Sequence, residues 1–128
     1  MITETKKNNR NYIKNSINEE LQDLNFDFGH IGTRYLLDSI YLLYSLKKYY
    51  KFSLESDVYP VIANKYGDNA RAIKGAISYA IDRMIENCDE ETLINYVDED
   101  EYRNYECGID KIGTKKIIRA VLKRIKEL

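Results

Sequence analysis

The sequence of 128 residues contains one proline, Pro60, and six glycines, and runs of alternating β-branched residues are absent. Proline and glycine are the residues that most often interrupt helices, so their scarcity leaves room for long helices. The missing alternation argues against strands. At this length a chain can bury an ordinary core within one domain. We therefore expect an all-α protein with a single domain.

Histidine and cysteine are almost as scarce: His30 is the only histidine, and Cys88 and Cys107 are the only cysteines. One histidine excludes a His-His metal site, and the two cysteines lack partners at zinc spacing. A glycine-rich phosphate loop is absent, and the acidic run 98–101 lacks the spacing of a calcium loop. His30 is better explained as a turn residue than as a catalytic base. We expect no enzyme activity, no metal and no cofactor.

No apolar run approaches the roughly 20 residues that a membrane-spanning helix needs, and no secretory signal is evident. Two cysteines without such a signal do not form a disulfide framework and stay reduced in a cytosol. We expect a cytoplasmic protein with no membrane partner.

The formal net charge of -1 hides a segregation of charge along the chain. Nine acidic residues and one basic residue lie from Glu86 to Glu106, whereas seven basic residues and no acidic one lie from Lys111 to Lys126. Four further cations lie near the start of the chain, at Lys6, Lys7, Arg10 and Lys14. Segregated charge can present a basic face to a polyanion, although a solvated helix surface with i,i+4 pairs explains it equally well.

Apolar periodicity predicts six helices, at about residues 13–24, 33–50, 58–66, 70–85, 90–97 and 115–128. Ser56 or Asp57 would cap the third helix, whose first turn admits Pro60, and Thr114 would cap the last. Residues 98–108 are expected to be irregular. We divide the chain into a basic N-terminal arm with a short helix, 1–25, and a main domain, 26–128.

The segment YPVIANKYGDNARAIKGAISYAI, residues 59–81, has the spacing of a helix-turn-helix. Such a motif needs a small residue where the two helices cross, which Ala63 supplies, and a residue that accepts positive φ in the turn, which Gly67 supplies. The apolar residues that would hold the two helices at a steep angle are Ile62, Tyr66, Ile73 and Ala76.

The N-terminal part of the second helix in this motif enters the major groove of DNA. The residues that we expect to be exposed there are Asn69, Arg71, Lys74, Gly75 and Ser78, with Tyr79 near the edge. Asn69 is suited to adenine, and Arg71 or Lys74 to guanine or a phosphate. Gly75 costs roughly 1 kcal/mol against alanine inside a helix. Close approach to DNA or to another helix would explain it, and so would simple tolerance.

Two other groups of side chains bear on nucleic-acid binding. Basic residues lie along one side of the last helix and are candidates for phosphate contacts: Lys115, Lys116, Arg119 and Lys123. Eight tyrosines, at 35, 41, 44, 49, 50, 59, 66 and 79, could stack on unpaired bases, but their helical spacing favours packing in the core.

Four segments occur in an order that resembles a known family: GTRYLLDSI (32–40), VYPVIANKYG (58–67), AIKGAISYAID (72–82) and GTKKIIRAVLKRI (113–125). They are similar to the C-terminal effector domain of the stage zero sporulation response regulator, the master regulator of endospore formation in Firmicutes. The resemblance covers roughly residues 26 to 128. It is most specific in the Tyr-Pro-x-Ile-Ala-x-Lys-aromatic run and the following Ala-Ile-x-x-Ala-Ile helix.

The resemblance implies a six-helix fold whose helix-turn-helix binds a short box in double-stranded DNA, often as tandem dimers. It also makes the apolar side of the last helix a candidate for dimerisation. It also implies contact with the sigma subunit of RNA polymerase through the region after the recognition helix, where this chain has the acidic segment 89–101. By the same likeness, Ala72, Lys74, Gly75 and Ser78 stand where the family places arginines and a glutamate on DNA. None of the four matches, so the likeness implies the fold more strongly than the DNA sequence that is read.

The chain departs from the family in two other places. The loop before the last helix, 102–112, lacks the proline with which the family enters that helix. Only about 25 residues precede the main domain, which leaves no room for a receiver domain. We therefore expect a sequence-specific transcriptional regulator without a receiver domain, acting as a homodimer, with its recognition helix at about 70–85. An accessory DNA protein of a plasmid or phage is a variant of this hypothesis. The alternative is a protein-interaction module of the same fold that acts on RNA polymerase, a sigma factor or another regulator.

Overall fold

The computed structural model describes residues 2–126, with side chains from residue 10 onward, and the regular secondary structure in that range is all helical. The helices are α1 (Ile2–Asp23), α2 (Ile31–Ser45), α3 (Tyr59–Tyr66), α4 (Ala70–Asn87), α5 (Glu90–Val97), α6 (Glu99–Glu106) and α7 (Thr114–Lys126), and a π-helical turn η1 (Leu54–Val58) precedes α3. The expected all-α, single-domain class is confirmed. Within residues 2–126 no helix is both long and apolar enough to cross a bilayer.

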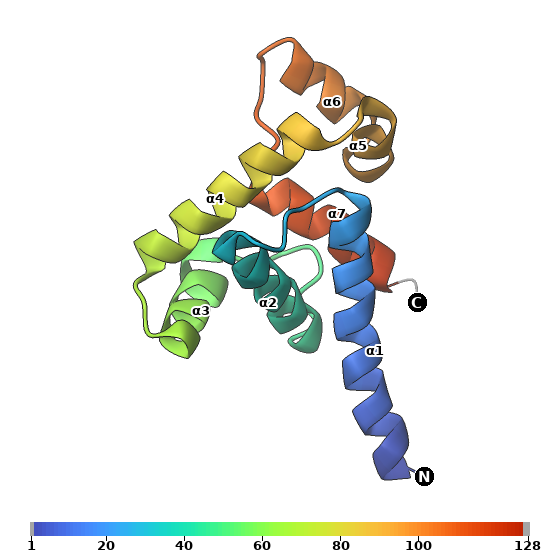
Figure 1. Ribbon diagram of the computed structural model, residues 1–128, viewed down its shortest axis with the longest axis vertical. Coiled ribbons are helices and arrows are strands. Elements are labelled where there is room, and N and C mark those ends of the chain that lie inside the picture. Colours follow the sequence, from blue (N-terminus) through green and yellow to red (C-terminus); the bar gives the residue numbers. More distant parts are fainter. Residues whose placement is uncertain (1, 127–128) are drawn as a thin grey trace.

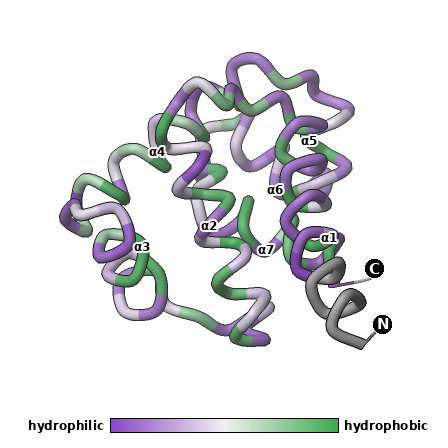
Figure 2. The backbone as a smooth tube through the Cα atoms, turned by 60° about the horizontal axis from the view of Figure 1, so that its bottom comes forward, coloured by the Kyte–Doolittle hydropathy of each residue, from purple (hydrophilic) through white to green (hydrophobic). Residues whose placement is uncertain are grey.

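Helix α2 lies in the middle of the fold (Figure 1), where Leu36, Ile40 and Leu43 are completely buried. Helix α4 crosses it, with α3 at one end of α4 and the pair α5–α6 at the other. In Figure 2 hydrophobic stretches of α2 and α7 (green) lie near the middle of the view. Five side chains of α7 are buried in this core: Ile117, Ile118, Val121, Leu122 and Ile125.

The burial of α7 corrects one expectation. Its apolar side was a candidate for dimerisation, but that side packs inside the domain against α2 and the neighbouring helices. Exposing it would cost about 1.5–3 kcal/mol for each large aliphatic side chain. A second copy of the chain can therefore reach α7 only through its polar, basic side.

Helix α1 is 22 residues long, rather than the short helix that we expected. Its second half belongs to the core, because Ile17 and Leu21 are completely buried, as is Leu24 directly after the helix. The helix ends at Asp23, and Asn25, with φ 71, then turns the chain away. The backbone N–H of Phe26 then donates to the carbonyl oxygen of Leu21 at 3.0 Å.

Two helix boundaries differ from the prediction because of local caps. Helix α2 stops at Ser45 instead of about residue 50, since Lys47 adopts φ 56 and the N–H of Lys48 bonds the carbonyl oxygen of Leu43 at 2.9 Å. Helix α7 begins at Thr114, so Thr114 is its first residue and not its cap; the N–H of Ile117 donates to the carbonyl oxygen of Gly113.

The entry to α3 also differs from the prediction. Neither Ser56 nor Asp57 caps α3; both lie in η1, where the hydroxyl of Ser53 accepts from the N–H of Ser56. Helix α3 then starts at Tyr59 without a side-chain cap, and Pro60 sits in its first turn as expected.

Helix α6 lies in the stretch that we expected to be irregular, so the described chain has seven α-helices instead of six. Asp98 makes this possible by ending α5 with φ 71 and capping α6 through its carboxylate, which accepts from the N–H of Glu101 at 2.9 Å. No residue of α6 is buried. Without a buried side it has no apolar periodicity in the sequence, which is why periodicity missed it.

Candidate nucleic-acid interface

The predicted turn between α3 and α4 is formed as expected. Gly67 has φ 67 and φ of this sign is accessible to glycine without strain. The next N–H, from Asp68, donates to the carbonyl oxygen of Ala63 at 2.9 Å. Asn69 is the residue before α4, so only three residues separate α3 from α4.

The apolar skeleton of the motif is confirmed at three positions, because Ile62, Ala63 and Ile73 are buried. Tyr66 was expected to help hold α3 against α4, and it does not. It is 38% exposed, packs edge-on against Tyr35 of α2 and donates its hydroxyl proton to Asp38. Burial and the Asp38 carboxylate raise the pKa of Tyr66 to about 12. Tyr66 therefore ties α3 to α2 rather than to α4.

The first turn of α4 is capped by Asn69. Its Oδ1 accepts from the N–H of Ala72 at 2.9 Å, and its own N–H donates to Asp68 Oδ1 at 2.8 Å. A bidentate pair with adenine needs both the oxygen and the amide of an asparagine. While Asn69 caps α4, only its amide remains to donate, so adenine reading by Asn69 would require the cap to open.

The outer side of α4 presents the other predicted residues. Arg71, Lys74 and Gly75 are exposed, Ser78 is half-buried, and Tyr79 is 54% exposed. Ala72, which the family likeness added, is half-buried. No atom of the described chain lies within 4 Å of a Cβ placed on Gly75. Close approach by another helix of the described chain therefore does not explain Gly75, whereas close approach to DNA and simple tolerance of the glycine both remain as explanations.

The charges on this side change along the helix. Arg71 makes no ion pair with any described residue, and Lys74 pairs with Glu55 at 3.6 Å, with both side chains more than half exposed. Exposed pairs contribute little, about 0–1 kcal/mol, so Lys74 can exchange this partner for a phosphate. Further along, Asp82 and Glu86 are exposed carboxylates, and the exposed cation between them, Arg83, pairs with Glu86 at 2.9 Å. An excess of positive over negative charge is thus confined to the first half of α4.

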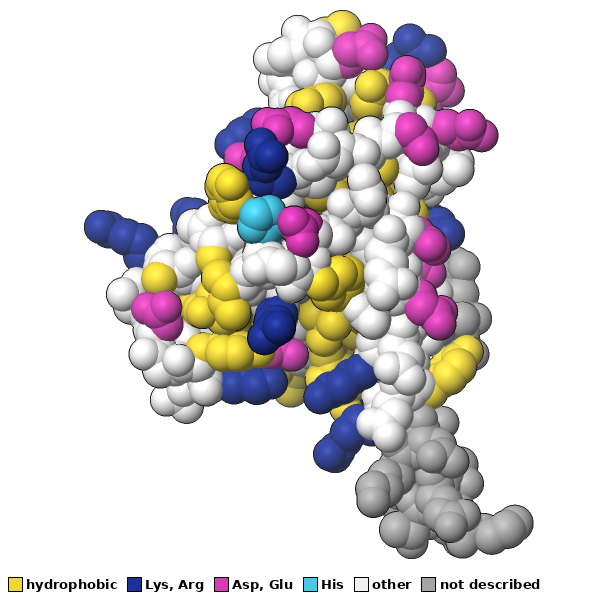
Figure 3. All heavy atoms as spheres, viewed as in Figure 1, with side chains coloured by type: hydrophobic (Ala, Val, Ile, Leu, Met, Phe, Trp, Pro, Cys, Tyr) yellow, Lys and Arg dark blue, Asp and Glu magenta, His cyan; other side chains and the backbone are white. Residues whose placement is uncertain are grey.

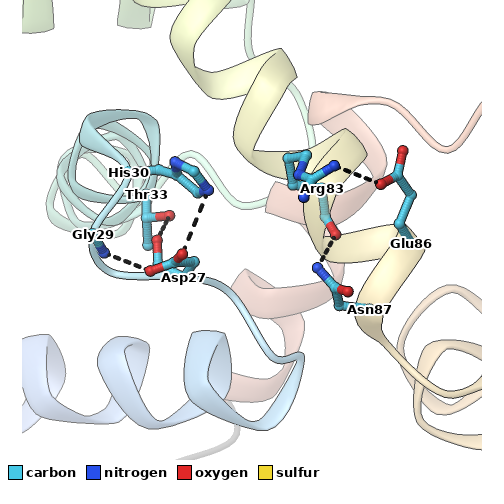
Figure 4. A network of polar contacts seen from close by, with 7 residues as sticks. All are labelled: Asp27, Gly29, His30, Thr33, Arg83, Glu86 and Asn87. Carbon is cyan, nitrogen blue, oxygen red and sulfur yellow. Dashed lines mark hydrogen bonds and ion pairs between the residues drawn. The ribbon is translucent and has the colours of Figure 1, made fainter.

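A loop that we did not predict to be part of the site lies beside the second half of α4 (Figure 4). The backbone N–H of Gly29 donates to Asp27 Oδ1 at 2.8 Å, and the Thr33 hydroxyl donates to the carbonyl oxygen of Asp27 at 2.7 Å. The loop places His30 edge-on against Tyr79, with ring centroids 5.3 Å apart. Only the fold brings these two rings together, because 49 positions separate them in sequence.

Three of the four predicted residues of α7 are held by other parts of the chain. Lys115 lies over the ring of Phe52 at 5.3 Å, Lys116 pairs with Asp110 at 2.7 Å, and Arg119 donates to the carbonyl oxygen of Tyr50 at 3.1 Å. Lys116 and Arg119 line a cleft of about 770 Å³ that runs between α7 and α5–α6. They belong to a surface different from the outer side of α4.

Acidic side chains gather on α5 and α6, at the top of the view in Figure 3. Burial, with Asp98 nearby, raises the pKa of Glu101 on the edge of the α7 cleft. Among residues 2–126, no group of three or more histidine, cysteine or carboxylate side chains is placed to hold a metal ion. The concentrated negative charge at this end would repel a phosphate backbone.

Comparison with protein families gives a match over most of the chain. The family model of the C-terminal domain of the sporulation initiation factor Spo0A matches residues 17–125. The match begins inside α1, earlier than the resemblance at 26–128 suggested, and it takes in the buried residues Ile17, Leu21 and Leu24. No curated protein and no solved structure matches the chain.

Proposed function

The chain belongs to the family of the C-terminal domain of sporulation initiation factor Spo0A, a family of DNA-binding effector domains, and on this premise we propose that it is a sequence-specific transcriptional regulator acting on double-stranded DNA in the cytoplasm. The first half of α4 is the part that would enter the major groove. The observation that carries the proposal is the pair of exposed cations, Arg71 and Lys74, beside the bare backbone of Gly75.

Electrostatics supports insertion of the first half of α4 rather than the second. Arg71 and Lys74 would approach phosphates or guanine edges, whereas Asp82 and Glu86 would face the phosphate backbone if the helix lay along the groove for its whole length. The positive end of the helix dipole also lies at Ala70. A helix entering by its N-terminal end avoids the repulsion and uses all three attractions.

The DNA box read by this chain would differ from the box that the family reads. Gly75 and Ser78 offer no long side chain, so base edges would come close to the helix backbone there, and Tyr79 with His30 would border the contact. The edge of the Tyr79 ring beside these small residues would favour apolar contact with a thymine methyl group there. Specificity would come from Arg71, Lys74 and Ser78, with shape complementarity at Gly75.

A salt titration tests the proposal. Binding to genomic duplex fragments and to random duplexes is measured by fluorescence anisotropy between about 50 and 300 mM salt. A DNA binder loses affinity steeply as salt rises, with a slope set by the number of phosphates contacted. Arg71→Ala should weaken binding by about 1–3 kcal/mol or lower the salt slope by about one.

Arg103→Ala is the matched control, because it removes the same charge from α6, where Arg103 pairs with Glu99 at 2.6 Å. It should leave duplex binding unchanged. Absence of duplex binding at the lowest salt would overturn the proposal, and equal losses in the two variants would reduce it to nonspecific charge attraction.

The acidic surface of α5–α6 supports a second role, contact with a protein such as the sigma subunit of RNA polymerase. Its exposed carboxylates are Glu90, Glu91, Asp98, Glu99, Asp100 and Glu106. We propose that this surface docks a basic region of the partner while α4 holds DNA. Reversing charge in Glu90→Lys with Glu91→Lys should abolish binding to purified sigma subunit in a pull-down and leave duplex affinity intact. If sigma binds while no duplex does, the chain is an interaction module instead.

A homodimer on DNA is also part of the proposal. Since the apolar side of α7 is buried, the dimer contact would involve polar surfaces and form chiefly on adjacent DNA boxes. Sedimentation with and without a duplex carrying two boxes tests this; a monomer in both conditions would contradict it.

A further inference from the structure

A cleft of about 530 Å³ lies between α1 and the end of α2, away from the cleft beside α7. We call it the tyrosine cleft. It is lined by Arg10, Tyr12, Ile13, Tyr41, Tyr44, Ser45, Lys47 and Tyr49. In Figure 3 hydrophobic side chains, tyrosines included, follow the strip between α2 and α1, and Lys and Arg side chains lie at its lower end. Cavities of this size are typical of small-ligand sites.

The end of α2 builds one wall of the cleft. Tyr41 and Tyr44 lie one turn apart on α2, and the left-handed residue Lys47 reverses the chain directly after the helix. The reversal brings Tyr49 back against Tyr44, with ring centroids 5.8 Å apart and planes at 70°. The opposite wall comes from α1, where Tyr12 is 53% exposed.

The tyrosines of this cleft differ from those that pack in the core. Tyr35 and Tyr59 are 7% and 2% exposed, as core packing requires, while Tyr41, Tyr44 and Tyr49 are half-buried and Tyr12 is largely open. The sequence left two explanations for the tyrosines, packing and stacking on bases. In the fold some tyrosines pack in the core, whereas the tyrosines around this cleft keep part of their ring surface accessible to a ligand.

Positive charge accompanies the rings. Arg10 and Lys47 line the cleft, and no carboxylate of the described chain does so. The Lys14 ammonium lies 4.9 Å from the Tyr41 ring centroid, and the Lys126 ammonium lies 5.1 Å from that of Tyr49. A ligand that combines a flat ring with negative charge would match both features.

We infer that the tyrosine cleft binds a nucleotide, with the base against the tyrosine rings and the phosphate on Arg10 and Lys47. A free mononucleotide and an unpaired nucleotide of single-stranded DNA share this chemistry. The site is separate from the proposed duplex contact on α4, because no residue of α4 lines the cleft. Either site can therefore fail in an experiment while the other is retained.

Binding is followed by ¹H–¹⁵N NMR on the full chain during titration with AMP and, separately, with an oligo-dT of eight nucleotides. We expect chemical-shift changes at the amides of Tyr12, Tyr41 and Ser45, with little change along α4. Response to both probes, or to AMP alone, indicates a mononucleotide site; response to oligo-dT alone indicates a site for single strands.

Two variants locate the contact. Tyr12→Ala removes a largely exposed ring and should weaken binding roughly fivefold to a hundredfold, as loss of one base stack does. Lys47→Asn removes a charge at a position where asparagine tolerates the positive φ, and should weaken binding of the phosphate-bearing probe but not of adenosine.

Arg71→Ala is the control, since it should impair duplex binding and leave the cleft unaffected. Shifts confined to α4, unchanged affinity in Tyr12→Ala, or no shift at millimolar AMP and oligo-dT would each overturn the inference. Shifts at the cleft that depend on protein concentration without either probe would also overturn it, because they would identify a second copy as the occupant.

Discussion

The backbone of Gly32 touches that of Ala76. A Cβ built on Gly32 would lie 1.9 Å from the carbonyl oxygen of Ala76 and 3.1 Å from the Cβ of Ala80. Helices α2 and α4 are thus in backbone contact at the point where α4 turns its other side to solvent. This contact sets how far α4 projects from the domain, and with it the position of Arg71 and Lys74.

Gly32→Ala should therefore destabilise the protein by at least about 1–3 kcal/mol, the range for overpacking a core, because a carbonyl oxygen cannot rotate out of the way. Urea unfolding followed by circular dichroism measures the loss. Gly113→Ala is the control, since a Cβ there meets no atom within 4 Å. Equal midpoints for the two variants would contradict the contact.

Gly75→Ala should have two opposite effects. Alanine stabilises a helix interior by roughly 1 kcal/mol over glycine, and nothing in the described chain obstructs the new methyl group. The melting temperature should rise by a few degrees. If DNA approaches the backbone at Gly75, duplex affinity should fall at the same time. Higher stability with unchanged affinity would place the DNA contact elsewhere on α4.

The acid stability of the protein should depend on Asp57. The N–H of Ser53 donates to Asp57 Oδ2 at 2.9 Å and the Lys48 ammonium to Oδ1 at 3.2 Å, and these bonds lower the pKa of Asp57. A lowered folded pKa stabilises the fold above the unfolded value, about pH 4, and this contribution is lost as pH falls through the folded pKa.

Asp57→Asn should accordingly lower the melting temperature at pH 7 and flatten its decline as the pH falls below about 4. Thermal melts across that range provide the measurement. Asp82→Asn removes an exposed carboxylate that makes no hydrogen bond or ion pair with the described residues, and its melting curve should follow that of the parent protein. A parallel decline in Asp57→Asn and the parent would refute the assignment.

The two cysteines should differ in reactivity. Burial, followed by the Asp89 charge, raises the pKa of the Cys88 thiol, and Cys88 is half-buried against the core while Cys107 is exposed. Since the thiolate is the reactive form, a disulfide reagent at pH 7.5 should modify Cys107 first. The Cys107→Ser variant should show only the slow phase, and a fast phase in that variant would contradict the assignment.

The sequence was sufficient where a residue acts through its neighbours in the chain. Gly67 for the turn and the periodic residues Ile62, Ile73 and Ile118 are examples, and the family match confirms the resemblance that these segments carry. It failed at α6, which has no buried side and is held by a cap at Asp98. It also misplaced Tyr66, whose partner Asp38 lies 28 residues away. The division of the chain at residue 25 and the DNA-contacting roles of the ten site residues remain predictions.

By itself the sequence determined that the chain is helical, that it carries a helix-turn-helix and to which family it belongs, because periodicity, turn residues and motif order are local properties. Tertiary structure alone decided which surfaces remain available. It buried the apolar side of α7, turned Lys116 and Arg119 toward the α5–α6 cleft and left Gly75 bare. Exposure depends on which helices pack together, and that is settled by contacts such as Gly32 against Ala76 between residues distant in the chain.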